Sequence, residues 1–242
     1  MSATPMNPAQ LDAVRYLDGP CLVIAGAGSG KTRVITQKVM RLVNAGINPE
    51  NIGAITFTNK AAQEMAERLK PMLSAAKARG TPMVCTFHSL GVRMLRGDGQ
   101  RLGLKRGFSI LDAEDAIGIV QQSLGTTDRK VARQAMSTIS LWKNGLLEPD
   151  LAAATAADQQ THAVARAYRD YAATLRAYQA VDFDDLIGLP VRLLQAFPEV
   201  AGRWRETLRY LLVDEYQDTN ACQYELLKLL VGPRAAFRRG RR

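Results

Sequence analysis

Short apolar runs alternate with helix-patterned stretches along the N-terminal part of the chain. The runs at residues 21–25, 51–57 and 82–87 are brief and continuous, as buried strands are. Between them, residues 32–46 and 59–70 carry apolar side chains near helical spacing. Gly46 ends the first stretch, and the breaker Pro71 follows the second. Strands that alternate with helices predict crossover connections and a parallel sheet with helices on both faces.

The pattern changes between about residues 112 and 195. Alanine and leucine dominate there, strand-like runs are absent, and residues 112–124, 133–144 and 161–180 have the periodicity of helices. A continuous apolar run returns at residues 208–215 and suits a buried parallel strand. We therefore predict one α/β domain, residues 1–110 and 196–234, interrupted by an all-helical insertion domain at residues 111–195.

Composition is that of an ordinary globular protein, with 47% hydrophobic and 23% charged residues in 242. The formal charge of +9 favours a polyanionic partner. Five arginines near the C-terminus supply much of it, and without them the charge falls to +4: Arg234, Arg238, Arg239, Arg241 and Arg242. The body of the chain is therefore only mildly basic.

Cysteine usage and hydropathy point to a reduced compartment. Cys21, Cys85 and Cys222 are far apart and form no CxxC motif, so we expect small core residues rather than disulfides. No apolar run reaches the roughly 20 residues that a membrane span needs, and the N-terminus lacks a basic start followed by an apolar stretch. We expect a cytoplasmic protein with no membrane partner.

The stretch AGAGSGKT, residues 25–32, lies between a predicted strand and a predicted helix; we call it the glycine loop. Glycines let successive backbone N–H groups approach phosphate oxygens, and the helix N-terminus adds partial positive charge. Lys31 can reach the β and γ phosphates and the Thr32 hydroxyl can ligate Mg²⁺. Ala25 stands where the usual pattern has glycine. The alternative, a turn that binds nothing, is disfavoured by the strand, loop and helix context.

The stretch VDEYQDTN, residues 213–220, follows the last predicted strand. A phosphate-binding loop needs a partner that holds the metal and orients the attacking water, and acids at the end of a neighbouring strand supply both. Asp214 would hold Mg²⁺ and Glu215 would polarise the water. The alternative is a solvated helix start whose acids favour the helix dipole.

Five motifs in order carry a resemblance to a known family: AGAGSGKT, TFTNKAAQEM (56–65), TFHSLG (86–91), DFDDL (182–186) and LLVDEYQDTN (211–220). Together they resemble the N-terminal part of a superfamily 1 DNA helicase of the Rep, UvrD and PcrA type. The resemblance runs from Met6 to about Phe237. It implies a RecA-like P-loop NTPase domain with a parallel sheet, interrupted by a helical insertion, in an enzyme that uses ATP to move 3′ to 5′ on single-stranded DNA.

The resemblance also implies residue roles at the nucleotide. ATP and Mg²⁺ are the expected cofactors, and Gln10 in MNPAQ (6–10) would read the adenine edge, although an ordinary capped surface helix is the alternative. The nucleotide-binding set is Gln10, Ala25, Gly26, Ala27, Gly28, Ser29, Gly30, Lys31, Thr32 and Arg33. The catalytic set is Lys31, Asp214, Glu215 and Gln217, and the metal ligands are Thr32 and Asp214.

By the same resemblance, single-stranded DNA and duplex junctions are the expected partners. Phe57 would stack on a base, Thr58 and Asn59 would bond phosphates, and His88 would meet backbone or base. Phe57 as a core residue and His88 as a satisfied histidine are the alternatives. DFDDL looks like an acid cluster at a helix start, so we assign it a structural role.

The basic tail at residues 235–242 departs from the family pattern. A GC-rich spelling of the Ala-Val-Gly-Asp-Asp expected there, read in a shifted frame, gives Arg-Gly-Arg-Arg, and the chain ends RRGRR. We therefore interpret the tail as out-of-frame sequence and the chain as truncated; a short arm that grips DNA is the alternative. Alone, the chain is expected to bind Mg·ATP and single-stranded DNA weakly, with little ATPase and no unwinding activity.

Three other functions are alternatives to a helicase motor. The motor of a recombination helicase-nuclease shares these motifs, but no nuclease segment is present. A non-hydrolysing module that binds ATP or DNA would keep its DNA affinity after loss of Lys31. Another P-loop enzyme such as a kinase is disfavoured by DEYQD and by the separate TFTNKAA and TFHS segments.

Overall fold

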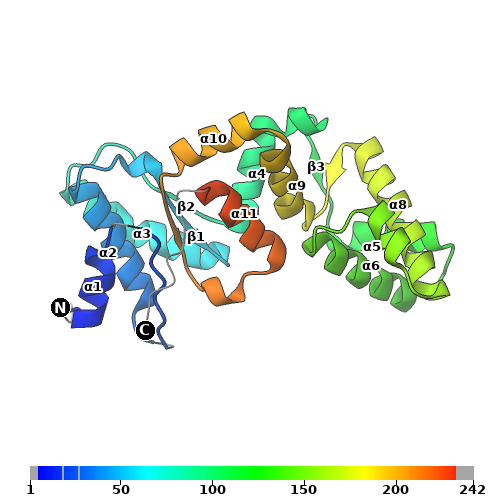
Figure 1. Ribbon diagram of the computed structural model, residues 1–242, viewed down its shortest axis with the longest axis horizontal. Helices are drawn as coiled ribbons and strands as arrows, with labels where there is room; N and C mark the ends of the chain where they lie inside the picture. The colour runs from blue at the N-terminus through cyan, green and yellow to red at the C-terminus, as the bar shows by residue number, and fades with distance from the viewer. Residues whose placement is uncertain (1–4, 18, 27, 233–242) are drawn as a thin grey trace. The chain divides into compact units, whose positions relative to one another are not determined.

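The computed structural model describes residues 5–17, 19–26 and 28–232 and combines helices with parallel sheets (Figure 1). Ala27 and the basic tail at residues 235–242 lie outside the described residues. The described chain forms two compact units. The first takes in residues up to Phe87, Ala201–Asp218 and those from Leu230 on, and the second takes in His88–Val200 and Thr219–Leu229. Among the described helices, none is both long and apolar enough to cross a membrane.

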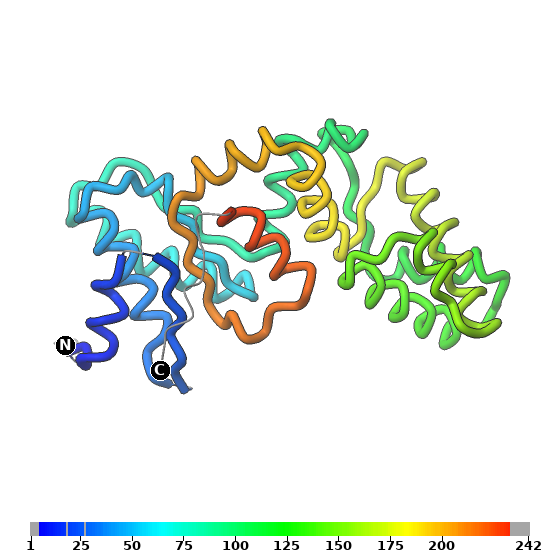
Figure 2. The backbone as a smooth tube through the Cα atoms, viewed as in Figure 1, coloured from blue at the N-terminus to red at the C-terminus, as the bar shows by residue number. Residues whose placement is uncertain are grey.

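The first unit is built around a three-stranded parallel sheet in the order β2 (Met83–Thr86), β1 (Ile52–Thr56), β5 (Tyr210–Val213). Figure 2 shows the orange segment that carries β5 beside the cyan segment that carries β1. β1 is central and buried along its whole length. The three strands predicted at these places are therefore confirmed, and their carboxyl ends meet at one edge.

Helices pack against this sheet because their apolar stripes match its apolar face. The helices of the unit are α1 (Pro8–Arg15), α2 (Lys31–Asn44), α3 (Asn59–Ala75) and most of α10 (Pro198–Thr207), with short 3₁₀ turns η1 (Pro49–Asn51) and η3 (Tyr216–Asp218). One buried cluster joins α2, β1 and α3: Val39, Met40, Leu42, Ile52, Ala54, Met65, Leu69 and Leu73. Burial of these side chains holds the sheet and its helices together.

Three expectations in this unit are corrected. Cys21, expected to be a core residue, is exposed. Pro71 lies inside α3 instead of ending it, because Leu69 and Leu73 on either side are buried in the α2–β1–α3 cluster and hold the helix through the lost backbone bond. Residues 21–25 form no strand, and the Ile24 side chain is 90% exposed. A β-branched run becomes a strand only when a neighbour supplies hydrogen bonds, and no described strand pairs with this one.

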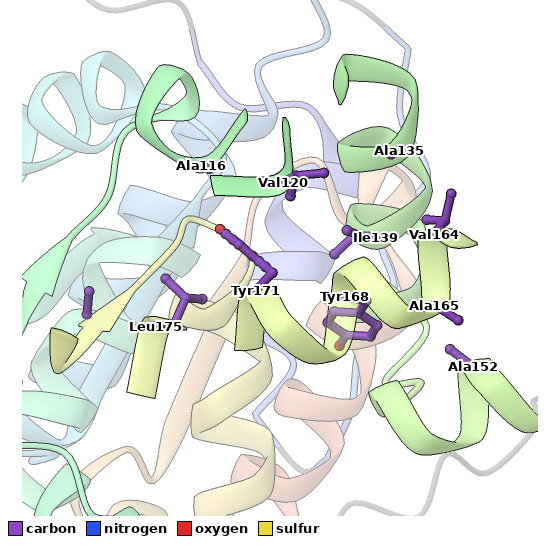
Figure 3. Packing of buried hydrophobic residues seen from close by; sticks show 11 residues of the cluster. Ala116, Val120, Ala135, Ile139, Ala152, Val164, Ala165, Tyr168, Tyr171 and Leu175 are labelled. Carbon is purple, nitrogen blue, oxygen red and sulfur yellow. The ribbon is translucent and has the colours of Figure 1, made fainter. Parts of the chain in front are cut away.

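The second unit is mainly helical. It contains most of α4 (Phe87–Asp98) and of α11 (Ala221–Val231), together with η2 (Gly99–Leu102), α5 (Ala113–Leu124), α6 (Arg129–Asn144), α7 (Pro149–Thr155), α8 (Gln159–Tyr178) and α9 (Asp185–Ala196). Figure 3 shows buried side chains from α5, α6, α7 and α8 converging on one cluster, in which Tyr168 and Tyr171 are the largest. The predicted helices at residues 112–124 and 133–144 are confirmed.

A short parallel pair of strands was not predicted. β3 (Ser109–Ile110) pairs with β4 (Ala180–Val181), where the sequence pattern favoured continued helix to residue 180. α8 ends at Tyr178 because Gln179 takes a left-handed conformation with φ of 51°. The Gln179 carbonyl then accepts a hydrogen bond from the Ser109 N–H at 3.2 Å.

Gly91, the glycine of TFHSLG, allows α4 and α9 to touch. A Cβ added at Gly91 would lie 1.7 Å from the backbone oxygen of Leu186. Any side chain there would separate the two helices, so glycine is required by packing rather than by backbone conformation.

Beside this contact, a buried cation holds the acid cluster of DFDDL. The Lys143 ammonium, at the end of α6, contacts Asp182 Oδ2 at 2.6 Å and Asp185 Oδ1 at 2.7 Å, and the Tyr171 hydroxyl donates to Asp182 Oδ2 at 2.8 Å. Burial alone lowers the pKa of Lys143, but the charges of Asp185 and Asp182 outweigh it and the pKa is raised. The structural role assigned to these two acids is supported.

We predict that Lys143→Met lowers the free energy of unfolding by about 3–5 kcal/mol, because it leaves two buried carboxylates without their cation. Urea unfolding followed by circular dichroism measures it. Lys228→Met is the matched control: Lys228 pairs with Glu225 at 2.7 Å but is 58% exposed, so its loss should leave the free energy of unfolding nearly unchanged. Equal effects of the two substitutions would contradict the structural importance of the buried cation.

We predict that Cys21 reacts with iodoacetamide much faster than Cys222 in the folded protein. Cys21 is exposed, whereas Cys222 is buried and its pKa is raised to about 11, chiefly by burial. Intact-protein mass spectrometry over time, with Cys21→Ser as the control, identifies the first site to react. Slow reaction of Cys21, matching Cys222, would mean that residues 21–25 are covered in solution.

Candidate functional site

The glycine loop turns sharply into α2. Gly28 and Gly30 adopt φ of 71° and 84°, a left-handed region that glycine enters without steric cost. The Ser29 hydroxyl donates to the Gly26 carbonyl at 2.7 Å and closes the turn. α2 begins at Lys31, with Thr32 and Arg33 in its first turn, so the free N–H groups and the positive end of the helix dipole face this loop.

The Lys31 ammonium lies folded back between the loop and an acid. Its Nζ is 3.4 Å from the Ala25 carbonyl, 3.5 Å from the Gly26 carbonyl and 3.6 Å from Glu215 Oε1. All three distances are long for hydrogen bonds or ion contacts. The lysine is therefore held near the loop by weak contacts and is free to exchange them for stronger anionic ligands.

Asp214 and Glu215 follow β5 directly, at the edge where β1 also ends. The Asp214 N–H donates to the Ile55 carbonyl at 2.9 Å, which extends the pairing by one residue and buries the Asp214 side chain. Burial raises the pKa of this carboxyl despite a hydrogen bond from the Glu215 N–H. A carboxylate that loses hydration in this way gains from a neighbouring cation.

The Glu215 backbone has an unusual conformation, and the Glu215 carboxylate has two partners. Its φ of 49° is unusual for a residue with a side chain. Gln217 Nε2 donates to one carboxylate oxygen at 2.6 Å, while Lys31 lies near the other. The bond from Gln217 lowers the pKa of Glu215, and the Lys31 charge adds to the effect. The four residues predicted to be catalytic are thus joined by direct contacts.

Gln10 lies against the glycine loop although it is distant in sequence. Asn7 caps α1 and exchanges hydrogen bonds with Gln10: the Gln10 N–H donates to Asn7 Oδ1 at 2.8 Å and the Asn7 N–H donates to Gln10 Oε1 at 2.9 Å. The Gln10 Nε2 donates to the Ser29 carbonyl at 2.7 Å. The helix cap therefore fixes a side-chain amide beside the loop.

The metal prediction rests on two oxygen donors. Thr32 supplies a hydroxyl and Asp214 a partly desolvated carboxylate, which are the hard ligands that Mg²⁺ prefers. Within the described residues no group of three or more histidine, cysteine or acidic side chains could hold a metal ion by itself. Thr32 and Asp214 would fit a Mg²⁺ ion whose remaining ligands are phosphate oxygens.

Phe57, Thr58 and Asn59 follow β1. The Phe57 ring is half-buried and meets the Phe87 ring edge-on, with centroids 5.5 Å apart. Thr58 caps α3 by accepting from the Ala61 N–H at 3.1 Å, and its side chain and that of Asn59 are exposed. The core alternative for Phe57 holds in part, since one side of the ring packs and the rest remains accessible.

His88 belongs to the second unit and stacks on Phe183, with ring centroids 3.7 Å apart and planes 25° apart. Burial lowers the pKa of His88, and the charge of Asp184 opposes the shift only in part. Phe183 is 61% exposed. The sequence did not identify Phe183 as a candidate, because DFDDL is mainly acidic. The available signal was an aromatic residue between acids.

Comparison with known proteins decides the family. The profile described as "UvrD/REP helicase N-terminal domain" matches residues 6–237. The chain belongs to this family. Membership in the UvrD/REP family places the glycine loop, the acid pair and the aromatic residues within one family domain.

Named relatives of the UvrD/REP family are similar over nearly the whole chain. The ATP-dependent DNA helicase Rep of Escherichia coli is 49% identical over 236 residues, which cover 96% of this chain and 35% of the relative. The ATP-dependent DNA helicase PcrA of Bacillus subtilis is 43% identical, with 93% and 31% covered. The ATP-dependent DNA helicase UvrD1 of Mycobacterium tuberculosis is 45% identical, with 94% and 30% covered. The chain spans about a third of the length of these relatives.

We predict that Gly30→Ala lowers the free energy of unfolding by about 1–2 kcal/mol, because an L side chain is strained in the left-handed conformation. The added Cβ would also lie 3.2 Å from Gln10 Nε2. Gly118→Ala, in α5 with open space around the added Cβ, is the matched control and should stabilise the chain by about 0.5–1 kcal/mol. Thermal and urea unfolding compare the two. Shifts of the same sign would contradict the loop geometry.

Proposed function

We propose that the chain is the ATP-binding motor segment of an ATP-dependent DNA helicase that moves 3′ to 5′ on single-stranded DNA. The observation that carries the proposal is the 3.6 Å contact between Lys31 Nζ and Glu215 Oε1, which joins the glycine loop to the acid pair in a chain of the UvrD/REP family. In this proposal residues 1–110 and 196–234 form a RecA-like P-loop domain, and residues 111–195 form its helical insertion.

The proposed nucleotide chemistry uses groups already near one another. Backbone N–H groups of the glycine loop take phosphate oxygens, and Lys31 exchanges its long contacts with the Ala25 and Gly26 carbonyls for the β and γ phosphates. Thr32 and Asp214 would hold Mg²⁺, which would neutralise phosphate charge when bound. The raised pKa of Asp214 favours metal binding, because the cation restores the stabilisation that burial removes from the carboxylate.

Glu215 and Gln217 have the proposed role of orienting the attacking water. Gln217 holds one Glu215 oxygen at 2.6 Å, and movement of Lys31 to phosphate would free the other oxygen to accept a proton from water. Gln10 would read the adenine edge with its side-chain amide, whose Nε2 carries a second N–H beside the one that it donates to the Ser29 carbonyl.

DNA contact is proposed for the residues after β1 and for the ring pair of the second unit. The accessible side of Phe57 offers a surface for a base, and exposed Thr58 and Asn59 offer polar groups for phosphate. The exposed Phe183 ring, backed by His88, is a second aromatic surface of the same kind. Single-stranded DNA and duplex junctions are the proposed partners.

We predict that Lys31→Ala weakens binding of a fluorescent Mg·ATP analogue about 10- to 100-fold, because charge-assisted hydrogen bonds are worth about 1.5–3 kcal/mol each. Single-stranded DNA affinity, measured by fluorescence anisotropy at two salt concentrations, should stay within about threefold and keep its salt dependence. Lys228→Ala removes the same charge from an exposed position on α11 and is the control. Unchanged nucleotide affinity in Lys31→Ala would refute the site.

The same proteins separate an enzyme from a binding module. The chain alone is expected to hydrolyse ATP only slowly, and residual hydrolysis that disappears in Lys31→Ala supports the motor function. Binding of nucleotide without any hydrolysis, even with single-stranded DNA present, favours a non-hydrolysing module.

A further inference from the structure

One side-chain amide in the second unit connects two segments that the proposed function uses. Asn144, the last residue of α6, accepts a hydrogen bond from Asn220 Nδ2 at 2.7 Å and donates one to Asp184 Oδ1 at 2.8 Å. Its Nδ2 also donates to the Ser140 carbonyl at 2.9 Å, which fixes the amide on its own helix. Both ends of the amide are therefore used, and its orientation is set.

The Asn220 side leads toward the acid pair. Asn220 closes the VDEYQDTN stretch that begins with Val213, Asp214 and Glu215. It also anchors the start of α11, since its N–H donates to Gln223 Oε1 at 3.0 Å and the Gln223 N–H donates to Asn220 Oδ1 at 2.8 Å. The chain leaves the first unit after Asp218, so this stretch is a covalent link from the acid pair to the second unit.

The Asp184 side leads to the stacked rings. Asp184 directly follows Phe183, whose ring stacks on His88, and the charge of Asp184 acts on the His88 ring. The flanking acids, Asp182 and Asp185, are held by Lys143, the neighbour of Asn144 on α6. The end of one helix thus fixes the backbone on both sides of Phe183.

We infer that Asn144 is a positioning residue that couples the nucleotide site to the Phe183–His88 pair. A shift of the VDEYQDTN segment on nucleotide binding reaches Asn220, and the Asn144 amide passes it to Asp184 and so to the aromatic surface. This inference rests on the proposed function, because it needs both nucleotide and DNA to bind. The quantity that tests the inference is a coupling ratio, the factor by which one ligand changes the affinity of the protein for the other.

The test compares variants that break the amide contacts in different ways. Asn144→Leu removes both contacts. Asn144→Asp keeps the acceptor for Asn220 but places a carboxylate against that of Asp184. The double variant Asn144→Asp with Asp184→Asn restores both contacts, because the new amide at position 184 can donate to the new carboxylate. Asn51→Leu is the control, since Asn51 makes two bonds of 3.2 Å to the Glu206 and Thr207 carbonyls within the first unit.

Each protein is titrated with fluorescent oligothymidine, with and without a non-hydrolysable Mg·ATP analogue, and the ratio of the two dissociation constants is the readout. The ratio should differ from one by about fivefold or more in the unaltered chain and in Asn51→Leu. It should fall to within about twofold of one in Asn144→Leu and Asn144→Asp and return in the double variant. The affinity for DNA without nucleotide should change by less than about threefold. A purely structural role of Asn144 would not predict a lost ratio together with a retained affinity.

The outcomes are distinct. Failure of the unaltered chain to bind nucleotide or DNA overturns the proposed function, and the inference with it. Binding of both ligands with a ratio of one, or an unchanged ratio in the Asn144 variants, overturns the inference alone. If Asn144→Leu does not fold, the Asn144→Asp protein and the double variant decide: loss and recovery of the ratio supports the inference, and an equal ratio in both overturns it.

Discussion

The parallel pairing of β1 with β2 and β5 is the constraint on which the first unit depends. In parallel strands the register aligns the carboxyl ends, and here Thr56 faces Thr86 while Ile55 faces Val213. The residues that follow each strand therefore emerge at one edge of the sheet. That edge carries Phe57 after β1, Phe87 after β2 and Asp214 after β5. A slip of one residue in the register would misplace every one of these side chains.

Left-handed backbone conformations recur where the candidate site is most closely arranged. Gly28 and Gly30 take left-handed conformations at the loop, and Glu215 takes one with a full side chain. Such conformations persist only where surrounding contacts stabilise them. For Glu215, these contacts include the bond from Gln217 and the nearby charge of Lys31. The geometry thus keeps a carboxylate, a cation and a helix N-terminus together.

In the DFDDL motif of the second unit, neighbouring residues have different environments. Asp182 and Asp185 face a buried cation and hold the chain, while Phe183 between them stays exposed. Buried charges are costly unless paired, so the cation at Lys143 is needed for the acids to remain there. The same pairing leaves the aromatic ring free to stack on His88. Structural and proposed DNA-binding roles therefore alternate along adjacent residues of a single motif.

Sequence alone determined the strands β1, β2 and β5, most of the helices, the order of the motifs and the family resemblance. These depend on local periodicity and on motif spacing, which a chain carries without its fold. The tertiary structure decided that residues 21–25 remain exposed, that Pro71 lies within a helix and that β3 pairs with β4. It also decided that Gln10 meets the glycine loop, that Lys143 holds DFDDL and that Asn144 links Asn220 to Asp184. Those outcomes depend on partners distant in sequence, because strand pairing, ion pairing and close packing are properties of two segments at once.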